Sequence, residues 1–205
     1  MTTRATETPG LLLRHPDGQT FRFDPGALCL ELLATGGPGD HARFEVLTGP
    51  QALAAWVAES RLPPGLRLAA DDTGAAAARA LRDALWGVVA ARAHGRPADP
   101  AGLAAVNAAA AEPPLVPLIA ADGTHGWAPG EAPVAALLST VARDAVDLLT
   151  GPSAHRVREC ATHNCALLFV DTSRPGRRRW CSMERCGNRH KVRTHRARAS
   201  DGTAS

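Results

Sequence analysis

The sequence predicts an α+β fold in two parts: a larger N-terminal part with short hairpins and several helices, and a small C-terminal part built around cysteines. Three observations predict it. Segments in which apolar and polar residues alternate flank turn residues early and in the middle of the chain. Between and after them, apolar residues recur at helical spacing. Four of the five cysteines form two pairs with one spacing, C-x4-C, near the C-terminal end.

The first elements are a hairpin and a short apolar segment. We expect residues 1–9 to be a disordered leader. In residues 11–24, apolar and polar residues alternate on both sides of Pro-Asp-Gly, which is typical of a β-hairpin. Residues 27–35 are apolar and predict either a strand or one or two helical turns. Cys29 lies there among leucines and is expected to be a buried, unreactive thiol.

Helical patterns dominate the middle of the chain. A helix is expected to open at 48–50, with Pro50 near its first turn and Leu53, Trp56 and Val57 on its apolar face. A second, capped by Asp72 or Thr73, runs to about residue 94, and a third covers 100–111 with Leu103 and Val106 inward. The segments 115–120 and 124–128 predict a second hairpin, and a last helix follows over 132–149.

Charge divides the chain at 151–153. Residues 1–150 carry 11 basic and 16 acidic side chains, a net charge of −5, whereas residues 151–205 carry 12 and 4, a net charge of +8. A basic segment attached to an acidic body suggests a polyanionic partner. We therefore expect an α+β domain over 10–151, a separate module over 154–198, and a disordered tail over 199–205.

The two cysteine pairs predict a closed zinc site. Zinc prefers four tetrahedral ligands, and two short-spaced pairs brought together by a fold-back supply four thiolates, Cys160, Cys165, Cys181 and Cys186. The fifteen residues between the pairs predict a hairpin: a strand at 167–170, a turn at 173–176 and a strand returning to Trp180. Phe169 and Trp180 are expected to cover the metal, and Gly187 to donate its N–H to a thiolate.

Each cysteine pair with the turn between its two residues is expected to form a zinc knuckle, and a basic helix is expected after Cys186. Knuckle, hairpin and helix together would form a treble-clef-like zinc finger. One structural Zn²⁺ would stabilise a segment that has too few apolar residues to fold alone. Disulfides, an iron–sulfur cluster and His163 in place of one cysteine are the alternatives. Four thiolates leave no open coordination position, so we expect no catalytic metal and no enzyme.

These residues resemble the CGNR zinc-finger family, whose name-giving run is residues 186–189. The resemblance includes LFVDTSR at 168–174, RRWCSM at 178–183 and KVRTHRAR at 191–198, and departs at Ala166, where the family usually has glycine. The segment 10–151 resembles the ABATE domain in CLELLAT (29–35), LTGPQALAAWV (47–57) and LRDALWGVVAARAHG (81–95). The two resemblances imply a stress-responsive transcription regulator that binds zinc through the four cysteines.

The basic residues of the finger are the expected nucleic-acid contacts, because a rigidly held cationic helix suits a phosphate backbone or a major groove. They are Arg177, Arg178, Arg179, Arg185, Arg189, Lys191, Arg193, Arg196 and Arg198. Double-stranded DNA is the expected partner. RNA and an acidic protein surface are the alternatives.

The N-terminal part is expected to sense a signal or to form a homodimer, since one small finger seldom makes enough base contacts alone. The sequence supports no particular small-molecule effector. The N-terminus lacks a signal peptide and no apolar run could cross a membrane, so we expect a cytoplasmic protein without membrane contacts.

Overall fold

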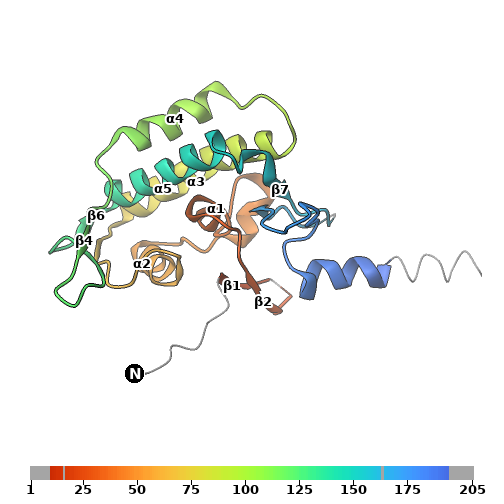
Figure 1. Cartoon of the computed structure of the whole chain (residues 1–205), viewed down its shortest axis with the longest axis horizontal. Coiled ribbons are helices and arrows are strands. Elements are labelled where there is room, and N and C mark those ends of the chain that lie inside the picture. The colour runs from red at the N-terminus through yellow and green to blue at the C-terminus, as the bar shows by residue number, and fades with distance from the viewer. Residues whose placement is uncertain (1–9, 16, 163, 194–205) are drawn as a thin grey trace, which may run out of the picture.

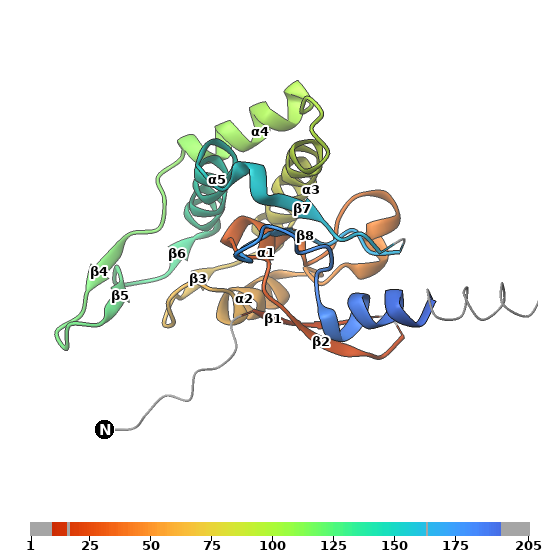
Figure 2. The same ribbon diagram turned by 45° about the vertical axis from the view of Figure 1, so that its right-hand side comes forward.

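The computed structural model describes residues 10–15, 17–162 and 164–193. Three helices pack on one another: α3 (Asp72–Ala93), α4 (Pro100–Ala111) and α5 (Val134–Thr150). Beneath them lie the short helix α1 (Leu28–Leu33) and α2 (Pro50–Glu59), and the N-terminal hairpin and the C-terminal helix lie on the far side (Figures 1 and 2). The predicted mixed α+β class is confirmed.

The N-terminal hairpin forms as predicted from its alternation. Strands β1 (Leu11–Arg14) and β2 (Thr20–Phe23) pair antiparallel with Leu13 opposite Phe21. Phe21 and Phe23 are buried on one face of the hairpin, whereas Leu12 points to solvent. This hairpin therefore has an apolar face that must pack on another part of the molecule.

The apolar run after the hairpin is the helix α1, whose six residues are all buried. Cys29 is fully buried there, as expected, and its backbone N–H donates to the Asp144 carboxylate of α5 at 2.8 Å. Burial raises the pKa of the Cys29 thiol. A thiol in this setting is protonated and packs as a small apolar side chain.

The long helices follow the predicted stripes with two corrections. Asp71, rather than Asp72 or Thr73, caps α3 by accepting from the Gly74 N–H at 2.6 Å. In α4 Val106 is buried, but Leu103 is 41% exposed because this alanine-rich helix packs with one side only on α3 and α5.

Two further strand pairings complete the described residues of the N-terminal part. Strands β4 (Pro117–Ile119) and β5 (His125–Trp127) form the predicted second hairpin. Strands β3 (Leu68–Ala69) and β6 (Ala132–Pro133) pair in parallel, so the last helix begins at Val134 and not at 132. Among the described residues, no helix is long and apolar enough to cross a membrane.

A buried ion pair fixes the segment between α1 and α2. Arg82 of α3 is only 1% exposed, and its guanidinium donates two hydrogen bonds of 2.8 Å to the Glu45 carboxylate. Glu45 ends the 3-10 helix η1 (Gly39–Phe44). The pair therefore holds η1 against α3, where η1 forms one wall of the cavity described below.

Candidate metal centre and its basic surface

The four predicted ligands lie on two short connections at the C-terminal end of the chain. Strands β7 (Val157–Glu159) and β8 (Leu168–Val170) pair antiparallel, with Val157 opposite Val170. Cys160 and Cys165 lie in the loop between these strands. Cys181 precedes, and Cys186 lies on, the π-helical turn η3 (Met183–Gly187), which continues as an α-helix over 188–193.

The predicted strand pairing between the two cysteine pairs is wrong. β8 pairs with β7, which precedes Cys160, and the returning segment 177–180 forms no strand. The cause is Asp171, which is buried at the end of β8. Its carboxylate accepts from the Ser173 N–H at 3.0 Å, the Ser173 hydroxyl at 2.6 Å and the Arg178 N–H at 2.9 Å, and so folds 171–178 into a compact loop.

The sulfur geometry fits one zinc ion. The four Sγ atoms all lie within 4.8 Å of one another, with Cys165 and Cys181 3.7 Å apart and Cys181 and Cys186 3.5 Å apart. A tetrahedron with Zn–S bonds of about 2.3 Å has S–S edges of about 3.8 Å. The four cysteines therefore form a closed site for one structural zinc, as predicted.

The crowding of the four thiols also favours a dication. Hydrogen bonds from Cys165 and Cys181 lower the pKa of the Cys160 thiol, whereas donation to Cys160 raises the pKa values of Cys165 and Cys181. Against an opposing hydrogen bond with Cys160, hydrogen bonds from Cys165 and Cys181 also lower the pKa of the Cys186 thiol, to about 7. Two of the four thiols thus ionise readily, whereas the other two resist ionisation. Binding of Zn²⁺ would supply the charge that holds all four as thiolates.

Aromatic side chains from two distant parts of the chain cover the cysteines. Phe169 is fully buried against them and Trp180 packs beside it, as predicted. Phe21 and Phe23 of the N-terminal hairpin, which were not predicted to cover the site, pack in the same cluster as Cys160, Cys181 and Cys186. Their alternation gave the signal of a buried face, but it did not reveal that this face covers the metal site.

Gly187 has a different role from the predicted one. Its N–H donates to the Ser182 carbonyl at 3.0 Å and not to a thiolate, and the N–H near a sulfur is that of Cys181, 3.4 Å from Cys160 Sγ. A Cβ at position 187 would lie 2.8 Å from the Met183 sulfur. Met183 is 52% exposed and its flexible side chain can move aside, so this contact alone does not require glycine at position 187.

Two of the predicted nucleic-acid contacts point into the protein. Arg185 is only 4% exposed and its guanidinium lies over the Phe21 ring, so the expectation that it is available to a polyanion is wrong. Arg178 lies over the Phe169 ring and donates to the carbonyls of Trp180, Cys181 and Asp24. Both guanidinia attach the finger to the N-terminal hairpin and the residues that follow it.

The other predicted cations divide between two surfaces. Arg189 and Arg193 lie on the helix face next to the cavity, and Arg189 pairs with Asp17 of the hairpin loop at 2.7 Å. Arg177, Arg179 and Lys191 are exposed away from the cavity. Arg196, Arg198 and the alternative ligand His163 lie outside the described residues.

Comparison with protein families places these features together. The ABATE model, described as "Putative stress-induced transcription regulator", matches residues 26–152, and the CGNR zinc finger model matches residues 156–199. A search of curated proteins finds no match. Because the ABATE match alone covers more than half of the chain, the protein belongs to the ABATE family and carries a CGNR zinc finger with four clustered cysteines at its C-terminal end.

Proposed function

We propose that this protein is a DNA-binding transcription regulator whose zinc finger presents a basic surface to double-stranded DNA. The membership in a family described as a transcription regulator supports this proposal. So does the contrast between the acidic body and the basic finger. In this proposal the zinc is structural, the protein is not an enzyme, and it acts in the cytoplasm on nucleoid DNA.

One arrangement carries the proposal. The ring of Trp180, at the end of the arginine-rich segment, lies 5.5 Å from the ring of His190 on the C-terminal helix. The Arg179 guanidinium lies over Trp180, 5.3 Å from the ring centre. The aromatic contact therefore brings the segment that carries Arg177 and Arg179 next to the helix that carries Lys191. We call these three exposed residues the basic ridge.

The basic ridge suits phosphates better than single-stranded bases. Its cations are exposed, whereas Trp180 is partly buried against the metal site and already contacts the His190 ring and the Arg179 guanidinium. Recognition of single-stranded RNA usually needs free aromatic faces for stacking. We therefore favour duplex DNA, bound through phosphate contacts whose affinity falls steeply with salt.

The test is fluorescence anisotropy with labelled random duplex DNA at several salt concentrations, using zinc-loaded full-length protein. We expect Arg177→Ala/Arg179→Ala to weaken binding about 10-fold or more and to reduce the slope of log affinity against log salt by about 2, that is about 1 for each lost phosphate contact. The control, Arg67→Ala/Arg96→Ala, removes two exposed charges from the body. Equal weakening in both variants, or tighter binding of single-stranded RNA than of duplex, would contradict the proposal.

The proposal includes a homodimer, because the basic ridge alone covers few base pairs. Light scattering after size exclusion, with and without duplex DNA, measures the mass directly. A monomer in both states would remove this part of the proposal and leave the DNA contacts themselves untouched.

A further inference from the structure

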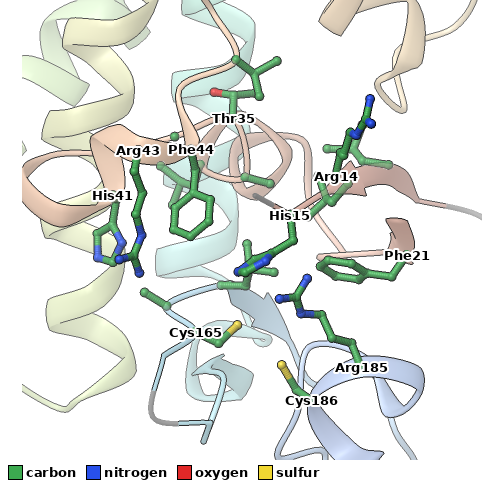
Figure 3. Close-up of a pocket in the computed structure, with 18 of the residues that line it drawn as sticks. Arg14, His15, Phe21, Thr35, His41, Arg43, Phe44, Cys165, Arg185 and Cys186 are labelled. Atoms are coloured by element: carbon green, nitrogen blue, oxygen red, sulfur yellow. The ribbon is translucent and has the colours of Figure 1, made fainter. Parts of the chain in front are cut away.

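A cavity of about 730 Å³ lies between the ABATE part and the zinc finger (Figure 3). Its walls come from the N-terminal hairpin, η1, α2 and α3 on one side, and from the 162–167 loop and the C-terminal helix on the other. This volume lies within the range of about 300–1,000 Å³ that is typical of small-molecule sites. Neither the zinc site, which adjoins it at Cys165 and Cys186, nor the basic ridge accounts for it.

Much of the wall is apolar and aromatic. Leu33 ends α1, Phe21 lies on the hairpin and Phe44 ends η1. Trp56 and Trp86 come from α2 and α3. Such a wall accepts an aromatic or aliphatic body, because apolar surface is removed from water on both partners.

The charged groups at the cavity are mainly cationic. Five arginines line it, against three carboxylates, those of Asp40, Glu59 and Glu159. The arginines are Arg14, Arg43, Arg185, Arg189 and Arg193. The Glu159 carboxylate lies 2.7 Å from His94 Nε2, and the Arg189 guanidinium pairs with the Asp17 carboxylate. Arg43 and Arg193 make no ion pair with any other described residue, so the cavity keeps an excess of positive charge.

Two buried donors border the cavity without an acceptor. Arg185 Nη1 and Trp56 Nε1 are both buried and have no hydrogen-bond partner among the described residues. The other terminal nitrogen of Arg185 is 3.5 Å from Asp17, which is a long contact. Buried donors are almost always satisfied in folded proteins, so these two point to an acceptor oxygen supplied by a ligand.

Figure 3 shows how the charges approach the cavity. Arg43 reaches in from η1 and Arg185 from η3 on the opposite wall, with His15 between them. An anionic group placed here would contact cations from both parts of the chain, while its apolar body lies along the aromatic wall.

We propose that this cavity binds a small amphipathic anion, with a carboxylate or sulfonate at Arg185 and an aromatic or aliphatic body against Trp56 and Trp86. The ligand would bridge the ABATE part and the helix that carries Arg189 and Arg193. Resting on the function proposed above, it would also change the affinity for DNA, because Lys191 of the basic ridge lies on that same helix. The coupling is reciprocal, so DNA would change the ligand affinity by the same factor.

The site is tested with the fluorescent anion 1-anilinonaphthalene-8-sulfonate and zinc-loaded full-length protein, without DNA. We expect saturable binding with one site per chain, quenching of tryptophan fluorescence, and displacement by 2-naphthoate at least 10-fold stronger than by its neutral isostere 2-naphthamide. Absence of a saturable site, or equal displacement by the two naphthalenes, would overturn the proposal.

Variants locate the site. Arg193→Ala, on the exposed rim, is expected to weaken probe binding about 3- to 10-fold, and Arg185→Gln more than 10-fold. Lys191→Ala removes the same charge two residues earlier on the same helix but outside the cavity, and should leave binding within about twofold. If Arg185→Gln loses zinc, Arg193→Ala and Lys191→Ala decide alone, and equal affinity in these two overturns the assignment.

The regulatory part has its own measurement. Saturating 2-naphthoate is expected to change the Kd for duplex DNA at least about 5-fold in the wild type and less in Arg193→Ala. An unchanged Kd refutes the coupling, whereas loss of probe binding refutes the site itself. Because the probe titration contains no DNA, failure of the DNA-binding proposal leaves it interpretable.

Discussion

The cover of the metal site by the N-terminal hairpin leads to a prediction for Phe23→Ala. Phe23 is 1% exposed and packs in the same cluster as Cys160, Cys181 and Cys186, more than 130 residues later in the chain. Removing a fully buried phenylalanine side chain costs about 3–5 kcal/mol, because the lost apolar contacts are not replaced and a cavity remains.

The loss should be visible in both stability and zinc affinity. At about 2–4 °C per kcal/mol for a protein of this size, the Tm should fall by about 6–20 °C. If hairpin docking and zinc binding form one cooperative step, the zinc affinity should fall by about 10²- to 4 × 10³-fold, since each 1.4 kcal/mol is a factor of ten. Thermal unfolding and zinc competition with the chelator 4-(2-pyridylazo)resorcinol measure the two quantities.

The matched control is Leu12→Ala, which lies on the same hairpin but is 58% exposed on the opposite face. It should change stability by no more than about 0.5 kcal/mol and should not affect zinc affinity. Phe23→Ala and Leu12→Ala with the same zinc affinity would refute the reasoning, because the hairpin would then not be part of the metal site.

Chelation of zinc should abolish the fold of residues 156–193 while much of the α3–α5 helicity remains, because a structural zinc supplies about 10–16 kcal/mol. Far-UV circular dichroism and limited proteolysis measure the two effects, and simultaneous loss of all helicity would contradict the prediction. Burial opposes ionisation of the Glu45 carboxyl, but the Arg82 guanidinium lowers the pKa of Glu45 below its usual 4.5. The ion pair therefore stabilises the fold above about pH 4.5, and its contribution is lost as the pH falls through the lowered pKa. Glu45→Gln should cost about 1.5–3 kcal/mol in urea unfolding at pH 7 and less at acid pH, and a pH-independent difference would be inconsistent with this. Gly74→Ala should destabilise by about 1–3 kcal/mol despite the better helix propensity of alanine, because its Cβ would lie 2.6 Å from Val134 Cγ2; a raised Tm would show that α5 can move aside.

Local patterns in the sequence predicted most of the helices and the metal ligands. The stripe through Leu81, Leu85 and Val88 determines α3, and Gly95, with φ of +64°, ends it. The equal spacing of the two cysteine pairs was enough to predict the zinc site, because ligand spacing is itself a local property.

Long-range pairings were not predictable in the same way. The apolar run 167–170 was correctly identified as a strand, but its partner is β7 because Asp171 folds the following segment into a loop. The inward turn of Arg185 depends on Phe21, which lies 164 residues earlier. The cavity combines six separate segments, so no single window of the sequence could reveal it.

The small β7–β8 hairpin has a consequence for dissecting the protein. Val157, Leu168 and Val170 are buried in the main core together with α1, α3 and α5, although they belong to the finger by sequence. A fragment ending near residue 152 would expose the apolar surface that they cover, and an excised finger would lose both this support and the phenylalanines of the first hairpin. We therefore expect each half, when expressed alone, to be prone to aggregation, so that swapping fingers between relatives would require the recipient helices to be redesigned as well.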